Sequence, residues 1–150
     1  MTNDSTSTTI AKSWVLFVCA GNTCRSVLAE YIARRKFGQL IEPSSAGLRP
    51  GTIEHADNAI YTLKTLMAVD ASAHVPRDVR TVEIERADLV VAMSSQIAAE
   101  VRHLFPNLPA ERLVRWKIKD PYGTDLAEYQ RCAQSIYAEM KRLPLLAGKA

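Results

Sequence analysis

Four short apolar segments alternate along the chain with longer segments in which apolar residues recur every three or four positions. The short segments, which predict strands, are residues 14–19, 41–46, 88–93 and 112–116. The first of them, WVLFVC, is continuously apolar and partly β-branched, which is typical of a strand buried on both faces of a parallel sheet. The longer segments, which predict amphipathic helices, are residues 26–38, 57–68, 94–105 and the region from 124 onward.

Strands that alternate with helices in a chain of 150 residues predict one α/β domain, an open parallel sheet covered by helices on both faces. Residues 1–13 are rich in Ser and Thr and lack apolar periodicity, so they predict a flexible N-terminal segment, with the domain at residues 14–150. The last helix is expected to bury an apolar face that includes Leu126, with Cys132 close to it. Trp116 is expected to pack in the core.

The composition suits a single globular domain, with 47% hydrophobic and 23% charged residues. The net charge of +3 suits anionic ligands but is too small to indicate nucleic-acid binding. No apolar run approaches the roughly 20 residues that span a bilayer, and the first dozen residues lack the order of a signal peptide. We therefore expect a cytoplasmic protein without nucleic-acid or membrane partners. The three cysteines lack metal-ligand spacing and favour reactive thiols over disulfides, so we expect no metal and no cofactor.

The candidate chemistry is concentrated in the segment Cys19-Ala-Gly-Asn-Thr-Cys-Arg25-Ser26, which connects the first predicted strand to the first predicted helix. The C-x5-R-S spacing allows peptide N–H groups and a helix dipole to surround one tetrahedral oxyanion. Gly21 and Asn22 are the residue types that best tolerate left-handed backbone in such a loop. The G-x-x-x-x-G-K-[ST] pattern of nucleotide-binding loops is absent.

Cys19 and Arg25 supply complementary chemistry in this loop. The helix N-terminus and the nearby cation favour the thiolate of Cys19, which is the nucleophilic form of cysteine. The guanidinium of Arg25 can hold two phosphate oxygens at once, which a lysine ammonium cannot. We therefore expect Cys19 to attack phosphorus while Arg25 and the loop amides hold the other oxygens. Taken by itself, Cys19 would instead be interpreted as a structural cysteine at the end of a strand.

Asp120 opens the segment Asp-Pro-Tyr-Gly, which follows the last predicted strand. In a parallel sheet this segment reaches the same edge as Cys19, although about a hundred residues separate the two. Pro121 biases Asp120 away from helical conformation, and a displaced alkoxide or phenolate needs a proton from an acid at that edge. Asp120 is therefore the predicted general acid, with an ordinary turn as the alternative interpretation.

These two segments resemble the signatures of the low-molecular-weight protein tyrosine phosphatase family, V-C-x-G-N-x-C-R-S and D-P-[YF]. Residues 44–47, 70–77 and 87–93 also resemble the family in order and spacing. The resemblance implies a four-stranded parallel sheet with helices on both faces, and hydrolysis of phosphotyrosine in proteins through a cysteinyl-phosphate intermediate. It implies that Cys19 is the nucleophile, Arg25 the phosphate clamp, and Asp120 the acid and then the base.

The resemblance also implies supporting roles around the phosphate. Ser26 would stabilise the thiolate, and a hydrogen-bond network would hold the loop in shape. The residues implied in phosphate binding and loop support are Ala20, Gly21, Asn22, Thr23, Cys24, Ser26, Ser45 and His74. Each also has a simpler interpretation, such as a helix N-cap for Ser26 or a surface position for His74.

Departures from the family pattern leave the substrate open. Leu48 and Tyr122 are predicted at the substrate mouth, where Leu48-Arg-Pro-Gly stands in place of the aromatic wall of many phosphotyrosine-specific members. Thr23 also occurs in related protein-arginine phosphatases, so that activity is the first alternative. His55 and His103 have no matching partners and are predicted to be solvated.

Two further alternatives differ in reaction class. Arsenate reductases on this fold begin with the same cysteine but need relay thiols, and this chain has no cysteine between Cys24 and Cys132. A noncatalytic phosphate-binding module would need neither a nucleophile nor an acid. The expected partner is a phosphorylated protein, and the resemblance implies a bacterial tyrosine kinase or its targets.

Overall fold

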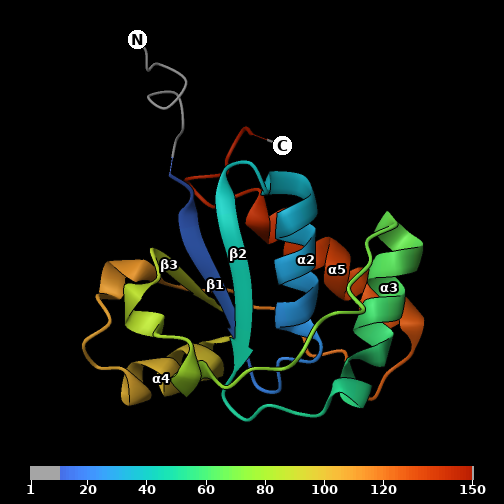
Figure 1. Ribbon diagram of the computed structural model, residues 1–150, viewed down its shortest axis with the longest axis horizontal. Helices are drawn as coiled ribbons and strands as arrows, with labels where there is room; N and C mark the ends of the chain where they lie inside the picture. Colours follow the sequence, from blue (N-terminus) through green and yellow to red (C-terminus); the bar gives the residue numbers. More distant parts are fainter. Residues whose placement is uncertain (1–10, 150) are drawn as a thin grey trace.

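The computed structural model of the protein describes residues 11–149 and contains one four-stranded parallel sheet (Figure 1). Its strands are β1 (Ser13–Cys19), β2 (Ile41–Gly47), β3 (Leu89–Ala92) and β4 (Leu113–Arg115). They lie in the order β2-β1-β3-β4, which confirms the predicted parallel sheet. Most of the segment predicted to be flexible, residues 1–10, lies outside the described residues.

Helices connect the strands close to the predicted positions. They are α2 (Arg25–Phe37), α3 (Asp57–Met67), α4 (Ser95–Leu104) and α5 (Leu126–Met140). Side-chain caps explain where the last two begin, because Ser94 accepts the Ile97 N–H and Asp125 accepts the Glu128 N–H. Short 3-10 helices, which have too few residues for a periodic signal, were not predicted; they are η1 (Ile53–Ala56), η2 (Val79–Thr81), η3 (Ile84–Arg86) and η4 (Ala110–Arg112).

Strand β1 divides the core between the two faces of the sheet. Val15 and Phe17 belong to the cluster packed against α2, α3 and α5, while Leu16 and Val18 belong to the cluster that includes α4. All four side chains are fully buried, as expected for a strand covered on both faces. Phe17 packs against Trp116 with ring centroids 5.8 Å apart, which confirms the core position predicted for Trp116.

The apolar face of α5 differs from the prediction at its first residue. Cys132 is buried on this face, as predicted. Leu126 is 39% exposed, so its predicted burial is wrong. It is the first residue of α5 and precedes Tyr129, the first residue of this helix that is buried.

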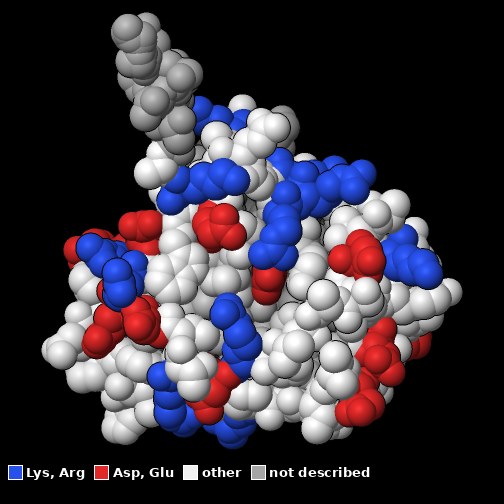
Figure 2. Space-filling model, viewed as in Figure 1, with Lys and Arg blue, Asp and Glu red and all other residues white. Residues whose placement is uncertain are grey.

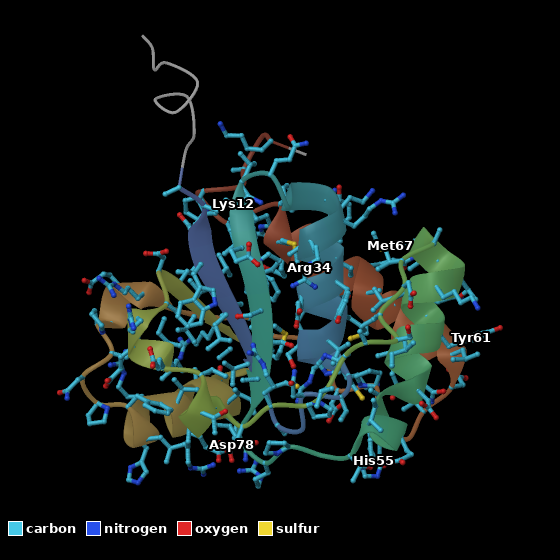
Figure 3. The ribbon with its side chains drawn as sticks, viewed as in Figure 1. Lys12, Arg34, His55, Tyr61, Met67 and Asp78 are labelled. Carbon is cyan, nitrogen blue, oxygen red and sulfur yellow. The ribbon has the colours of Figure 1, made fainter. Side chains whose placement is uncertain are left out.

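The parallel arrangement brings the carboxyl ends of the strands to one edge of the sheet, at the bottom of Figure 1. Cys19 ends β1 directly opposite Gly47, which ends β2. Helix α2 begins at Arg25 and runs back along the sheet, so its basic last turn, which contains Arg34, lies away from this edge (Figure 3). That turn is exposed. Figure 2 shows Lys and Arg side chains over the upper part of the same face. No helix within residues 11–149 has both the length and the apolarity needed to cross a bilayer.

Candidate active site

The segment between β1 and α2 forms a tight loop whose peptide N–H groups are free to bind an anion. Asn22 has a φ of 55°, so one of the two residues predicted to tolerate left-handed backbone adopts it. Within residues 11–149, the backbone N–H groups of residues 21 to 24 donate to no protein acceptor. Together with the positive end of the α2 dipole, these donors form a cradle for a tetrahedral oxyanion.

The outer side of this loop pairs with the segment that follows β2. Leu48 N–H donates to the Cys19 carbonyl at 3.1 Å, Arg49 N–H to the Ala20 carbonyl at 2.8 Å, and Gly51 N–H to the Gly21 carbonyl at 2.9 Å. The carbonyl and the next N–H of a trans peptide point in opposite directions. These bonds therefore turn the N–H groups of the loop away from residues 48–51.

A chain of buried hydrogen bonds orients one hydroxyl toward the Cys19 sulfur. Asn22 Oδ1 accepts the Arg77 N–H at 2.9 Å, which identifies Nδ2 as the other amide atom. Nδ2 donates to the hydroxyls of Ser26 (2.8 Å) and Ser45 (2.9 Å). The Ser26 proton is therefore available for Cys19 Sγ, 2.9 Å away, and this bond stabilises a thiolate.

Further contacts anchor this network to the rest of the fold. Ser45 donates to Glu30 Oε1 at 2.5 Å, and Glu30 in turn pairs with Arg34 at 2.9 Å. His74 is buried and donates from Nε2 to the Asn22 carbonyl at 2.9 Å. The structure thus brings Ser45 and His74, from distant parts of the sequence, behind the loop as the resemblance implied. Sequence reasoning missed Glu30, which lies in the second turn of α2, because an acidic residue near the start of a helix is explained by the helix dipole alone.

Arg25 connects the loop to the candidate acid. Its guanidinium is buried, donates to the Ile118 carbonyl at 3.1 Å and lies 3.7 Å from Asp120 Oδ2. Asp120 Oδ1 accepts the Tyr122 N–H at 3.1 Å, a local bond that fixes the carboxylate in its turn. The Asp120 side chain is half exposed, and its Oδ2 faces the Arg25 guanidinium, which would hold phosphate.

These groups line one cavity of about 260 Å³. Its walls contain the predicted nucleophile, clamp and acid, together with most of the loop; the residues are Cys19, Ala20, Gly21, Thr23, Cys24, Arg25, Arg49, Gly51, His55, Asp120 and Tyr122. A nucleophilic sulfur, amide donors, a guanidinium and a carboxylate around one space can support transfer of a phosphoryl-like group to sulfur.

A sequence model of a family described as low molecular weight phosphotyrosine protein phosphatase matches residues 14–147. The chain belongs to this family. A low molecular weight protein-tyrosine-phosphatase from Acinetobacter johnsonii is 30% identical over 81% of this chain and 89% of its own length. An arsenate reductase from Staphylococcus xylosus is 29% identical over 89% of this chain and 98% of its own.

Solved structures of the same family share the fold. A low molecular weight protein tyrosine phosphatase from T. tengcongensis matches with a TM-score of 0.75 and 29% identity, over 88% of this chain and all of its own. The YwlE arginine phosphatase from Geobacillus stearothermophilus matches with a TM-score of 0.77 and 26% identity, over 87% and 89% of the two chains. The protein is thus a phosphatase-family hydrolase on a scaffold that also carries other activities.

Two positions of this family member differ from the prediction. Leu48 is not at the substrate mouth, because it is 1% exposed and packs with Ala46 in the core beside α4. Residues two positions apart in an extended segment share a face, so Leu48 lies on the same side as Ala46. The N-cap role suggested for Ser26 is also wrong, because α2 begins at Arg25 with Cys24 in the N-cap position.

Arg49, Gly51 and His55 were not expected in the wall of the cavity. His55 is exposed, as predicted, but it also lines the cavity beside Tyr122. His103 is exposed on α4 and does not line it. The position of His55 depends on η1, an element too short to predict from periodicity.

The other two cysteines are buried and poorly suited to react. Cys24 Sγ lies 3.2 Å from the Tyr129 hydroxyl, and burial raises the pKa of the Cys24 thiol. Burial also raises the pKa of Cys132 to about 12. Both thiols are therefore protonated at neutral pH, when a thiolate would be needed for nucleophilic attack.

Proposed function

We propose that this phosphatase-family protein hydrolyses phosphotyrosine in protein substrates through a cysteinyl-phosphate intermediate. The observation that carries the proposal is the convergence of Cys19 and Arg25, from the loop between β1 and α2, and Asp120, from the segment after β4, on the wall of one cavity. The phosphatase relatives and the family match support the same reaction. A phosphate in the amide cradle would lie against both the nucleophile and the clamp.

The reaction has two transfers at phosphorus. The Cys19 thiolate attacks, the bond from phosphorus to the phenolic oxygen breaks, and Asp120 gives its proton to that oxygen as tyrosine leaves. In the second step the oxygen of a water molecule attacks the phosphorus of the phosphocysteine while Asp120 takes a proton from that water. The bond from phosphorus to sulfur breaks, which releases inorganic phosphate and regenerates the thiolate. Arg25 and the loop amides hold the remaining oxygens through both steps, and Ser26 donates to the sulfur when it leaves.

Substitution of the nucleophile and of the acid tests this assignment. Cys19→Ser should abolish turnover of a phosphotyrosine peptide but still bind vanadate, because the cradle and Arg25 remain. Asp120→Asn should slow hydrolysis by about 10²- to 10⁴-fold for poor leaving groups and less for activated aryl phosphates. An equal loss across leaving groups of different pKa would exclude Asp120 as the acid, and residual turnover by Cys19→Ser would exclude the nucleophile.

Protein-arginine phosphatase activity is the second candidate. Thr23 lines the cavity, and a solved YwlE arginine phosphatase has the same fold at 26% identity. Under this alternative, Thr23→Ile should depress kcat/KM on a phosphoarginine peptide much more than on a phosphotyrosine peptide. Wild-type kcat/KM on phosphotyrosine, phosphoserine and phosphoarginine peptides ranks the two candidates directly.

Two other activities are less well supported by the site. Arsenate reduction needs relay thiols, and the relatives with that name match at 28–30% identity, but Cys24 and Cys132 are buried thiols whose pKa values are raised. A noncatalytic phosphate-binding module would not need Asp120 beside Arg25. Arsenate-dependent oxidation of thioredoxin would support the first, and phosphate binding without turnover the second.

The proposal extends to the setting of the reaction. We place the enzyme in the cytoplasm, acting without a metal on a phosphorylated protein such as a bacterial tyrosine kinase or its targets. The sulfur nucleophile and the arginine clamp supply the roles that metal ions play in other phosphatases. Full activity in excess chelator supports the metal-free reaction, and loss of activity that added metal restores would overturn it.

A further inference from the structure

His55 and Tyr122 meet at the wall of the catalytic cavity, although they come from η1 and from the loop after β4. Their ring centroids are 5.8 Å apart and the ring planes are at 89°, an edge-to-face arrangement. Both rings line the cavity that contains Cys19 and Arg25. Figure 3 shows His55 on the turn before α3, at the end of the domain where the strands end. We call this pair of rings, His55 and Tyr122, the aromatic corner.

Residues 51 and 52, which follow the segment paired with the phosphate-binding loop, hold His55 in place. Thr52 N–H donates to His55 Nδ1 at 3.2 Å, and Gly51 N–H donates to the Gly21 carbonyl at 2.9 Å. A Cβ on Gly51 would lie 2.9 Å from His55 Nδ1 and 3.2 Å from the Thr23 methyl group, so the glycine leaves the space that the imidazole occupies. The ring is therefore fixed relative to the loop that binds phosphate.

The hydrogen bond from Thr52 also orients the imidazole. A backbone N–H can only donate, so Nδ1 accepts in this bond. An imidazole held in this orientation offers a flat aromatic surface, which suits contact with another aromatic ring.

We propose that His55 is a specificity-determining residue, and that the aromatic corner receives the aryl ring of the substrate while the loop holds its phosphate. This inference rests on the proposed function, because it assigns the recognition of the tyrosyl group in the same cavity. Two perpendicular rings offer a third ring one face and one edge, which are the two geometries that aromatic pairs favour. An alkyl phosphate such as phosphoserine has no ring to fill the corner.

Competitive inhibitors that differ in a single ring provide the test. Inorganic phosphate measures the cradle alone, whereas benzylphosphonate measures the cradle and the corner. In His55→Ala the inhibition constant of benzylphosphonate should rise about 3- to 10-fold, the value of one aromatic contact, and that of phosphate should change less than about twofold. The KM of a phosphotyrosine peptide should rise by the same factor, with little change in kcat. His55→Phe, which keeps a ring, should restore both values.

His103→Ala is the matched control, because it removes an exposed histidine that does not line the cavity. It should behave as the wild type with every ligand. Equal weakening of phosphate and benzylphosphonate in His55→Ala would show that His55 only supports the loop, and would overturn the inference. An unchanged benzylphosphonate constant would overturn it as well. If the wild type hydrolyses phosphoserine peptides but no aryl phosphate, the proposed function itself fails, a result that needs no variant.

Discussion

Gly47→Ala tests how closely the phosphate-binding loop depends on the end of β2. An added Cβ at Gly47 would lie 2.8 Å from the Ala20 carbonyl oxygen, 2.9 Å from the Asn22 nitrogen and 2.9 Å from the Gly21 carbonyl carbon. All three atoms are backbone, so no flexible side chain can move aside. Ordinary contact begins near 3.4 Å, and the loop must therefore retreat by about 0.5 Å.

A displacement of this size affects both catalysis and stability. A 1 Å misplacement can cost about 10²-fold in rate, so we expect Gly47→Ala to lose about 10-fold or more in kcat/KM. Overpacking of a buried site costs about 1–3 kcal/mol, which corresponds to a fall of about 3–10 °C in Tm for a domain of this length. The inhibition constant of inorganic phosphate should rise together with the loss in rate, because the cradle itself moves.

Thermal unfolding and initial rates on an aryl phosphate measure both effects. Gly148→Ala is the control, because that glycine has a φ of +76° and nothing within 4 Å of the added Cβ. It should cost about 1–2 kcal/mol in backbone strain and leave the rate unchanged. The steric argument fails if Gly47→Ala keeps the wild-type rate, phosphate affinity and Tm.

Three other predictions test the network, the thiols and a helix cap. Asn22→Ala removes three side-chain hydrogen bonds at a residue with φ 55° and should lower the free energy of unfolding by about 2–4 kcal/mol; a loss under 1 kcal/mol in urea denaturation contradicts this. Because burial raises the pKa of Cys132 to about 12, its contribution to stability is complete below the unfolded thiol pKa of about 8.5 and is lost as pH rises toward 12. The unfolding free energy of Cys132→Ala should therefore fall less steeply than that of the wild type between about pH 9 and 11, and equal slopes refute the assignment. Asp125→Ala should lose about 1 kcal/mol with unchanged kcat/KM, since only the α5 cap is removed, and an unchanged Tm would show that the cap contributes nothing.

Strand β1 and the loop after it were predictable because their sequence reports their surroundings directly. A run from Val15 to Val18 without a polar residue can only be buried on both faces. The spacing from Cys19 to Arg25 reflects the number of peptide groups needed to enclose one anion, so it indicates chemistry without knowledge of the rest of the fold. Asp120 was predictable in the same way, because strand direction alone determines the edge at which it emerges.

The wall of the cavity was less predictable, because it depends on register and on short turns. Leu48 and Arg49 exchange faces if the pairing of β2 shifts by one residue, and the sequence around Pro43 has no strong alternation to define it. His55 reaches the cavity through a 3-10 turn of four residues. Its only local signal is the Thr-x-x-His spacing from Thr52, which resembles a capping box and says nothing of a distant loop.

The bonds that attach residues 48–51 to the phosphate-binding loop run from backbone to backbone. Exposed side chains in this segment can therefore change in evolution without altering how the loop is held, while Gly47, whose added Cβ would meet only backbone atoms, cannot. Arg49 and its neighbour at 50, both exposed, are free to vary in charge and size. Substrate choice can thus diverge among descendants of one ancestral enzyme while the anion site beneath it is inherited intact.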